Sequence, residues 1–374
     1  MKAFFIFIAF LVFSCENQVN KCNLKVLSEK EHYIQNNLDP NVINYLKKGE
    51  QFLKDQLPTI ANFCPNINTV IYLSIQDDSL IIKHIKTNLS KDMAEDKANL
   101  NFGYINEKKF YLFNPKDQVI AIYNDKGNEV HRYSTTIKDQ NNTIKTLLYD
   151  EKAFIKNDKI ILPTIYNGIP ATSAKLKDYY NRNFGLIINK DSTYSIPEIK
   201  FPYNYRKGKG YHDISMYLST NKENDLYASF SKNDSLFIYN KDGQFKSKHF
   251  FGINFTHHFN YFENKASLKQ LKTYLKEEPR YFQLRYDPYN KMLIRSYKKR
   301  TVHNKNSIKK TKPETVWIFM DTQKHIYYDP NVKKLHSISL RNIGFSPKGM
   351  WDIEFNIKNG KHKLVYKLFQ LDYL

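Results

Sequence analysis

The feature that most constrains the fold is a long series of short β-strand patterns separated by polar turns. From Thr69 onward, apolar and β-branched runs of about five to seven residues alternate with clusters of Asn, Asp and Lys. This pattern predicts consecutive antiparallel hairpins, and Asn359-Gly360 is typical of a two-residue hairpin turn. The predicted strand-and-turn segments are residues 69–85, 109–133, 153–166, 184–196, 225–251, 281–297, 315–328 and 351–369.

One subpattern recurs along this meander: a strand, a turn of Asn, Asp or Lys, and a second strand. It reads VIAIYNDKGNEV, GLIINKDSTYSI, SLFIYNKDGQFK and VWIFMDTQKHIY, with turns near residues 125, 190, 242 and 321. Propeller blades contain about 40–50 residues, and insertions would widen the spacing. A long meander also has to protect its open sheet edges, and closure into a ring does so. We therefore predict an all-β fold, a β-propeller of six or seven blades over residues 67–374.

Three segments resemble the TolB-like six-bladed β-propeller lipoproteins of bacterial envelopes, a family of unknown function. FYLFNPKDQVIAIYN, residues 110–124, is similar to the first-blade pattern of that family. YDPYNKMLIRSY, residues 286–297, resembles a middle-blade pattern, with Ile294 where an aromatic residue is usual. GFSPKGMW, residues 344–351, resembles the last-blade pattern. The resemblance implies a propeller in the cell envelope and no particular activity.

The first residues, MKAFFIFIAFLVFSCEN, have the form of a signal peptide at residues 1–14. Lys2 supplies a short basic region, and the apolar run of about 12 residues that follows is shorter than the roughly 20 needed to cross a bilayer. Val12-Phe13-Ser14-Cys15 is similar to a lipobox, although Phe13 is bulkier than that pattern prefers. We therefore predict lipidation of Cys15, which anchors the chain to a membrane of a bacterial envelope. The outer membrane is favoured, with the protein on its periplasmic or external side. An ordinary secretory signal is the alternative.

Residues 15–66 differ from the meander and predict a lipid-anchored tether with a short helical lead-in. The sequence SEKE at residues 28–31 resembles a capping box, and Asp39-Pro40 is typical of the start of a second helix. This second helix would carry an apolar stripe to about Leu53.

Two cysteines besides Cys15 occur in the chain, Cys22 and Cys64. An even pair in an oxidising compartment is a candidate disulfide, and two thiols are the alternative. No C-x-x-C motif is present, so the sequence supports neither a redox motif nor a Cys-based zinc site.

The net charge of +21 (58 Lys and Arg, 37 Asp and Glu) raises the question of an anionic partner. A nucleic-acid partner is not predicted, because the signal peptide directs the chain away from the cytoplasm and the basic residues are spread along the sequence. The densest basic stretch, residues 298–312, lacks apolar periodicity and indicates a solvated loop. The predicted partners are the membrane, through the N-terminal lipid, and an envelope protein or polysaccharide.

No catalytic residue, metal ligand or cofactor site is predicted. The chain has 12 glycines and contains no phosphate-binding glycine-rich motif. His257-His258 would point to opposite faces of a strand, and His212-Asp213 has no identifiable third partner. The many Tyr and Phe residues favour packing between blades, and a surface for stacking sugars is the alternative interpretation.

Three functional hypotheses follow. The first is a binding or scaffold propeller displayed from a lipid anchor, with an unidentified ligand. The second is an envelope enzyme on the same fold, a glycan lyase or hydrolase, which would require clustered acid and base side chains around the central channel. The third is a sandwich-type adhesion module, which would show two packed sheets instead of radial symmetry. Fold alone does not decide among these functions.

Overall fold

The computed structural model describes part of the chain, and every structural statement below refers to that part. The described residues are 19–33, 60–76, 79–106, 108–139, 142–146, 154–156, 159–162, 164–166, 173–189, 191, 193–206, 215–221, 223, 225–253, 259, 274, 277–299, 315–329, 343–358 and 361–373. The expected helix from Asp39 to about Leu53, His212-Asp213, His257-His258 and Cys15 lie outside them.

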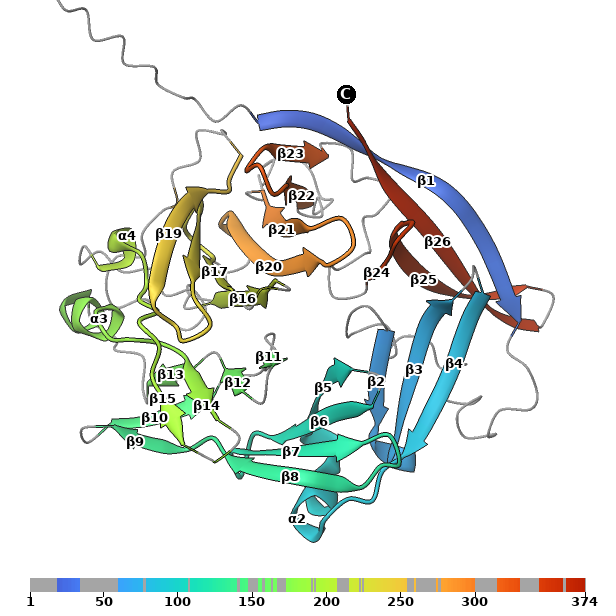
Figure 1. Cartoon of the computed structure of the whole chain (residues 1–374), viewed down its shortest axis with the longest axis horizontal. Coiled ribbons are helices and arrows are strands. Elements are labelled where there is room, and N and C mark those ends of the chain that lie inside the picture. The colour runs from blue at the N-terminus through green and yellow to red at the C-terminus, as the bar shows by residue number, and fades with distance from the viewer. Residues whose placement is uncertain are drawn as a thin grey trace, which may run out of the picture.

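Six antiparallel blades are arranged around a central axis, which confirms the predicted β-propeller (Figure 1). Blade 1 consists of β2 (Ile60–Cys64), β3 (Thr69–Gln76) and β4 (Ser79–Lys86). Blade 2 consists of β5 (Asn101–Asn106), β6 (Lys109–Asn114), β7 (Val119–Asn124) and β8 (Glu129–Ser134). Blade 3 consists of β11 (Phe154–Lys156), β12 (Lys159–Leu162), β14 (Leu186–Ile188) and β15 (Tyr194–Ser195).

Blade 4 consists of β16 (Met216–Thr220), β17 (Leu226–Phe230), β18 (Ser235–Tyr239) and β19 (Phe245–Phe250). Blade 5 consists of β20 (Arg280–Asp287), β21 (Met292–Lys298), β22 (Thr315–Met320) and β23 (Ile326–Asp329). Blade 6 consists of β24 (Gly344–Ser346), β25 (Gly349–Lys358), β26 (Lys361–Tyr373) and β1 (Val19–Tyr33). This radial arrangement excludes the two-layer sandwich.

Smaller elements lie between and beside the blades. A separate three-stranded sheet accompanies blade 3 and contains β9 (Ile137–Asp139), β10 (Asn142–Thr146) and β13 (Thr164–Tyr166). The helices are η2 (Pro65–Ile67), α2 (Lys91–Glu95), η3 (Lys97–Asn99), α3 (Ser173–Tyr180) and α4 (Tyr203–Arg206). None of the helices that the structure describes is long and apolar enough to cross a membrane.

The middle strands of each blade are apolar on both faces, because each face packs against a neighbouring blade. In β6, Phe110 and Leu112 point into the core between blades 1 and 2. Tyr111 and Phe113, on the other face, point into the core between blades 2 and 3. The same division of side chains occurs between blades 3 and 4, 4 and 5, and 5 and 6. This double burial explains why the strand patterns read as continuous apolar runs instead of a strict alternation.

The recurrent subpattern of the sequence forms the turn between the third and fourth strands of a blade. In the β18–β19 turn, Oδ1 of Asn240 accepts hydrogen bonds from the backbone N–H groups of Asp242 and Gln244, both at 2.9 Å. Asn124 has the same role between β7 and β8, and Asp321 between β22 and β23. A short side chain that bonds to its own turn is the usual reason for Asn and Asp at such positions.

Glycine in these turns lets the preceding segment of chain approach closely. Gly243 has φ +81°, and its carbonyl oxygen accepts a hydrogen bond from the N–H of Glu198 at 3.0 Å. A Cβ atom at Gly243 would lie 2.3 Å from Cβ of Pro197. Gly127 has the same role in blade 2, where its carbonyl oxygen accepts from the N–H of Asn88 at 2.8 Å. Each of these two turns therefore fastens the connection that leads into its own blade.

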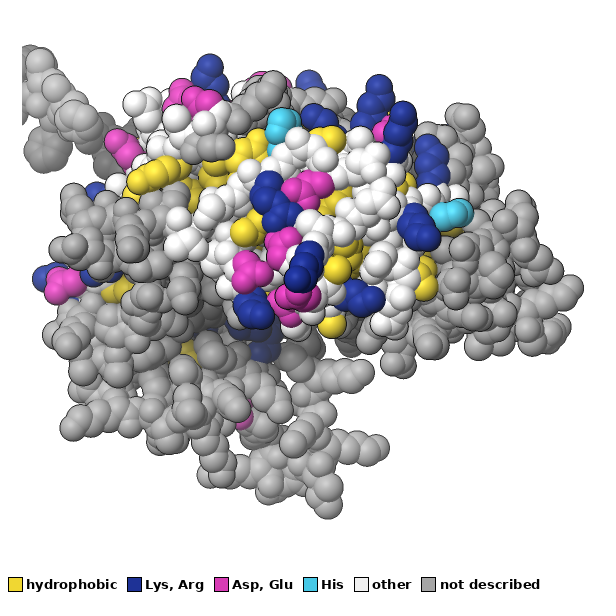
Figure 2. All heavy atoms as spheres, turned by 90° about the horizontal axis from the view of Figure 1, so that it is seen from below, with side chains coloured by type: hydrophobic (Ala, Val, Ile, Leu, Met, Phe, Trp, Pro, Cys, Tyr) yellow, Lys and Arg dark blue, Asp and Glu magenta, His cyan; other side chains and the backbone are white. Residues whose placement is uncertain are grey.

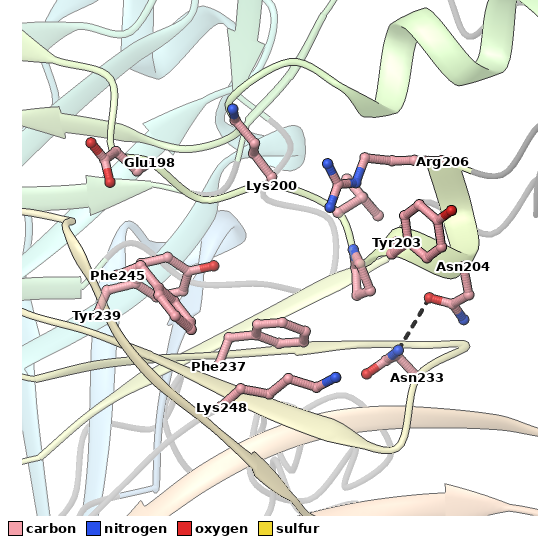
Figure 3. A pocket seen from close by; sticks show the side chains of 12 residues that line it. Glu198, Lys200, Tyr203, Asn204, Arg206, Asn233, Phe237, Tyr239, Phe245 and Lys248 are labelled. Carbon is pink, nitrogen blue, oxygen red and sulfur yellow. Dashed lines mark hydrogen bonds between the residues drawn. The ribbon is translucent and has the colours of Figure 1, made fainter.

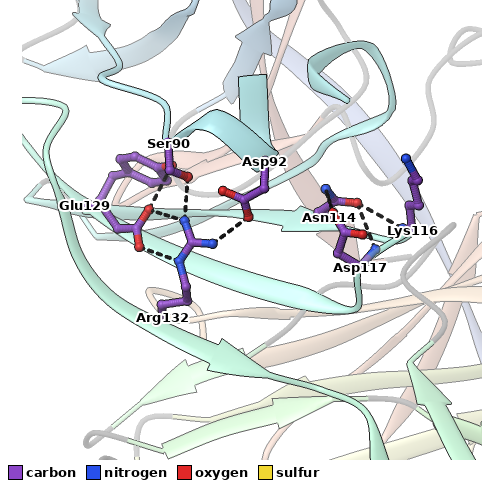
Figure 4. Close-up of polar contacts among 8 residues, drawn as sticks. Ser90, Asp92, Asn114, Lys116, Asp117, Glu129 and Arg132 are labelled. Carbon is purple, nitrogen blue, oxygen red and sulfur yellow. Dashed lines mark hydrogen bonds and ion pairs between the residues drawn. The ribbon is translucent and has the colours of Figure 1, made fainter. Parts of the chain in front are cut away.

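Two of the segments quoted above, residues 110–124 and 286–297, form closely similar hairpin turns. Between β6 and β7, Oδ1 of Asn114 accepts from the backbone N–H groups of Lys116 and Asp117, at 2.9 and 3.2 Å (Figure 4). Between β20 and β21, Oδ1 of Asp287 accepts in the same way from Tyr289, at 2.9 Å. The sequences FNPKDQ and YDPYNK thus encode one kind of turn.

The first described strand closes the ring. β1 pairs in antiparallel fashion with β26, from Cys22 opposite Tyr373 to Tyr33 opposite Lys363. At its start it also pairs in parallel with β23, where Val19 is opposite Ile326. Blades 5 and 6 therefore share one eight-stranded sheet, and β1 runs along the outer rim (Figure 1).

The prediction that residues 15–66 form a separate tether with a helical start is wrong for the described part of that segment. The capping-box pattern at residues 28–31 lies inside β1, and β2 begins blade 1 at Ile60. The reason is the alternation around Cys22 and Leu24, which pack against the core between blades 5 and 6, while Lys25 faces solvent. Pairing with β26 outweighs the local preference for a helix.

Cys22 and Cys64 are buried thiols and do not form a disulfide. Cys22 lies on β1 between blades 5 and 6, whereas Cys64 ends β2 in blade 1. Burial, with a smaller contribution from the charge of Asp329, raises the pKa of the Cys22 thiol to about 12.

A buried guanidinium joins blades 4 and 5. Arg295 on β21 is fully buried, and it donates hydrogen bonds to the carbonyl oxygens of Phe251, Phe230 and Asn233 at 2.8, 2.9 and 2.6 Å. Its Cζ atom lies 3.5 Å from the centre of the Tyr281 ring. Burial lowers the pKa of Arg295 to about 10. Carbonyl oxygens and an aromatic face thus stabilise the positive charge in place of water.

An ion-pair network fixes helix α2 to blade 2. Arg132 on β8 donates to Glu129 at 2.6 and 2.7 Å, to Asp92 at 2.5 Å and to Ser90 (Figure 4). Asp92 lies on α2 and Ser90 precedes it, so Arg132 connects this helix to the strand.

Figure 2 shows basic and acidic side chains interspersed at the centre of the visible face. This distribution agrees with the scattered charge of the sequence.

We expect Gly243→Ala to destabilise the fold. Alanine is strained at φ +81°, and its Cβ would overlap Pro197, so the free energy of unfolding should fall by about 1–3 kcal/mol. Urea denaturation of the full chain measures this change. Lys241→Ala, in the same turn and exposed, is the matched control and should change stability by less than about 0.5 kcal/mol. Equal midpoints for the two variants would contradict the prediction.

We expect the contribution of Asp92 to stability to depend on pH. The hydrogen bond from Arg132 lowers the pKa of the Asp92 carboxyl, so its contribution is present at neutral pH and is lost as the pH falls through the lowered pKa. The Asp92 and Arg132 side chains are both about one-third exposed, so solvent screens the ion pair. Asp92→Asn should therefore lower the free energy of unfolding by about 0.5 kcal/mol at pH 7 and leave it unchanged in strong acid. Urea denaturation across pH measures this difference. Glu95→Gln, which changes an exposed carboxylate on the same helix, is the control. If the loss of stability in Asp92→Asn does not vary with pH, the Asp92–Arg132 ion pair is not its cause.

Candidate ligand-binding pocket

A pocket of about 550 Å³ lies between the outer strands of blade 4, β18 and β19, and residues 198–206, which lead into that blade. Figure 1 shows β19 and α4 on the outer side of the ring. The volume of the pocket lies within the ~300–1,000 Å³ range of small-ligand sites. The lining residues are Glu198, Lys200, Phe201, Pro202, Tyr203, Asn204, Arg206, Asn233, Phe237, Tyr239, Phe245 and Lys248.

One wall of the pocket is the β18–β19 ladder. Register places Phe237 opposite Lys248 and Tyr239 opposite Phe245. Residues 237 and 239 share one face of β18, because successive side chains of a strand alternate. Nζ of Lys248 lies 5.8 Å from the centre of the Phe237 ring, and the Tyr239 and Phe245 rings meet edge to face with centroids 5.8 Å apart. The ladder therefore presents aromatic rings with a cation beside them (Figure 3).

The opposite wall is the short helix α4, which two buried aromatic residues hold in place. Phe201 and Tyr205 are 1% and 0% exposed, and their ring centroids lie 5.0 Å apart. Phe201 also packs against Phe230 of β17, with centroids 4.9 Å apart. A helix of four residues has little intrinsic stability, so this packing fixes its position. Tyr203 is directed outward and is 65% exposed.

Hydrogen bonds tie α4 to the turn between β17 and β18. The Tyr205 hydroxyl accepts from the backbone N–H of Lys232 at 2.8 Å and lies 3.1 Å from Oγ of Ser231. Nδ2 of Asn204 donates to the Lys232 carbonyl oxygen at 2.8 Å, and Nδ2 of Asn233 donates to Oδ1 of Asn204 at 3.1 Å (Figure 3). The two walls are thus held at a fixed distance before any ligand arrives.

The pocket carries an excess of positive charge. Lys200, Arg206 and Lys248 supply three cations and Glu198 one carboxylate, a net charge of +2. None of the three cations forms an ion pair with another described residue. Nε of Arg206 is buried without a hydrogen-bond acceptor in the described part of the chain. In Figure 3, Glu198 and Arg206 lie toward opposite ends of the pocket.

This arrangement suits binding better than acid–base chemistry. Exposed rings, cations and amides offer stacking, charge and hydrogen bonds to a polar ring-shaped ligand. Glu198 is the single acid of the lining, whereas glycoside hydrolysis usually employs a pair of carboxylates. Across the described residues, no three His, Cys, Asp or Glu side chains gather in a way that could hold a metal ion.

Sequence reasoning assigned no binding residue to this pocket. From sequence, the Tyr and Phe residues are expected to pack between blades, with a sugar-stacking surface as the alternative, and packing holds for Tyr205 and Tyr239. Tyr203 and Phe245 differ, because they are 65% and 52% exposed. The one sequence signal was the mixture of aromatic and basic residues in the segments YNYR and SLFIYNKDGQFKSKH.

Comparison with known proteins supports the fold of this chain. No protein-family model matches the chain, and no curated protein matches its sequence. The crystal structure of a member of the DUF4221 family from Bacteroides vulgatus aligns with a TM-score of 0.65 at 14% identity, covering 96% of this chain and 100% of that one. A catalytically inactive virginiamycin B lyase from Staphylococcus aureus, crystallised with quinupristin, aligns with a TM-score of 0.37 at 11% identity, covering 92% and 100%. The first likeness supports the six-bladed propeller and carries no activity to this chain.

Proposed function

We propose that the protein is a lipid-anchored propeller of the bacterial cell envelope that binds a ligand in the pocket between α4 and the β18–β19 ladder. The observation that carries this proposal is the pair of exposed rings, Tyr203 and Phe245, beside three cations that form no ion pair with another described residue. Exposed apolar surface beside polar groups is typical of a binding site. The hydrogen bonds between α4 and blade 4 support this function, because a preformed pocket loses less entropy on binding.

The proposed location in the cell envelope is inferred from the N-terminal sequence. Cys15 follows an apolar run with the form of a signal peptide and would carry the lipid. β1 begins at Val19, so the chain from Cys15 to the ring spans at most about 14 Å when fully extended. The start of β1 would therefore stay close to the membrane. We place the anchor in the outer membrane, with the protein on its periplasmic or external side.

The relation to the TolB-like lipoproteins is part of the same proposal. The three segments that carry it fall on the β6–β7, β20–β21 and β24–β25 hairpins, at residues 110–124, 286–297 and 344–351. Two of these hairpins share one type of turn, in which a side-chain oxygen accepts backbone N–H groups. Ile294 remains the departure from the pattern.

We expect Cys15→Ala to abolish membrane anchoring. The full chain is produced in a bacterial host that processes lipoproteins and is labelled with an alkyne analogue of palmitate. The natural sequence should carry the label and stay in the membrane fraction after a high-salt wash, because two or more acyl chains anchor a protein stably. Cys15→Ala should carry no label, while Asn17→Ala serves as the matched control. Label that persists on Cys15→Ala would exclude this anchor.

We expect loss of the two exposed rings to abolish ligand binding. The full chain in non-ionic detergent is heated with a panel of neutral oligosaccharides, acidic oligosaccharides, nucleotides and peptides. At least one class should raise the melting temperature of the natural sequence by mass action. Tyr203→Ala combined with Phe245→Ala should cancel that rise. Tyr194→Ala, which removes an equally exposed ring outside the pocket, is the control. A rise that survives in the double variant, or no rise with any class, would refute the pocket as the binding site.

A further inference from the structure

We infer that the ligand of this pocket is an acidic oligosaccharide, whose sugar rings bear carboxylate or sulfate groups. This inference rests on the proposed binding function and names the chemistry of its ligand. Three independent features of the pocket support it: charge, aromatic surface and amide groups.

The charge of the pocket favours an anionic ligand. Three cations line a pocket of about 550 Å³ with a single carboxylate, and the described residues offer them no ion-pair partner. Like charges gathered in one site repel one another, and a bound anion would relieve that repulsion. Arg206 adds specificity, because a guanidinium binds carboxylate and sulfate groups through two parallel hydrogen bonds.

The aromatic surface favours a ligand with flat, weakly polar faces. Tyr203 stands on one wall and Phe245 on the other, and both rings reach solvent. The negative face of an aromatic ring attracts the polarised C–H groups of a sugar ring. Because β19 and α4 lie on the outer side of the ring, several sugar units of a chain could extend beyond the pocket.

The amides provide partners for hydroxyl groups. Asn233 donates to Asn204, Asn204 donates to the carbonyl oxygen of Lys232, and Oδ1 of Asn233 accepts from the N–H of Ser235. Because an amide has two N–H groups, each of these side chains keeps one N–H for a ligand. Sugar hydroxyls both donate and accept, and amide side chains match that dual character.

A nucleotide also combines a ring with negative charge, but the pocket lacks the usual phosphate cradle. Its lining contains no glycine, and α4 has only four residues. Phosphate sites usually present several backbone N–H groups from a glycine-rich loop or a long helix. An acidic sugar therefore fits the lining better than a nucleotide.

The test compares charged and neutral forms of one sugar chain by calorimetry, on the full chain in non-ionic detergent. The probes are a galacturonate hexamer, its fully methyl-esterified neutral form, a sulfated galactan hexamer and ATP. We expect the galacturonate or the sulfated galactan to bind at least tenfold more tightly than the neutral ester, with affinity falling as NaCl rises. The two acidic probes distinguish a carboxylate-bearing from a sulfate-bearing ligand.

Two variants separate charge from stacking. Arg206→Gln should weaken binding of the acidic hexamer about tenfold and leave binding of the neutral ester unchanged. Tyr203→Ala should weaken both forms by a similar factor. Lys241→Gln removes an exposed cation outside the pocket and is the matched control. Unchanged near-ultraviolet circular dichroism shows that each variant is folded.

Each outcome has a definite meaning. Equal binding of charged and neutral hexamers, or no binding of either acidic hexamer, would overturn the inference of an acidic sugar. Tighter binding of ATP than of both acidic hexamers would replace the sugar by a nucleotide. The proposed binding function survives these failures if another ligand class still depends on Tyr203 and Phe245, and it fails only if none does.

Discussion

The structure depends on closing the ring, and closure depends on pairing between the two ends of the chain. β1 and β26 join residues separated by most of the sequence, from Cys22 opposite Tyr373 onward. The entropy cost of such a loop grows only slowly with its length. In return, closure covers the edges of two blades and completes the core between blades 5 and 6. Since neighbouring blades share each core, opening one junction would expose apolar surface on both sides.

Much of the fold could be predicted from sequence because its hairpins are local. The turns at Asn124, Asn240 and Asp321 carry their own hydrogen-bond acceptor, so a few residues suffice to recognise them. β1 was missed for the opposite reason. Its partners lie near the far end of the chain, whereas the SEKE sequence within it offered a local helix signal. Where local and distant interactions disagreed, the distant pairing decided the structure.

The pocket could not be predicted, because its two walls come from segments 198–206 and 233–248. The hydrogen bond from Glu198 to Gly243 and the buried rings of Phe201 and Tyr205 bring these segments together. In a chain with 28 Tyr and 26 Phe, aromatic content does not distinguish a binding ring from a core ring. Exposure makes that distinction, and exposure follows from the packing of blades, which no short motif encodes.

The burial of Cys22 has a consequence for the redox chemistry of the chain. Disulfide exchange requires a thiolate that can reach another sulfur. With a pKa of about 12, roughly one Cys22 thiol in 10⁵ is ionised at neutral pH. Ring closure also separates it from Cys64 by placing the two in different blades. Pairing of β1 with β26 buries the Cys22 thiol and keeps it protonated, which disfavours disulfide exchange at this position.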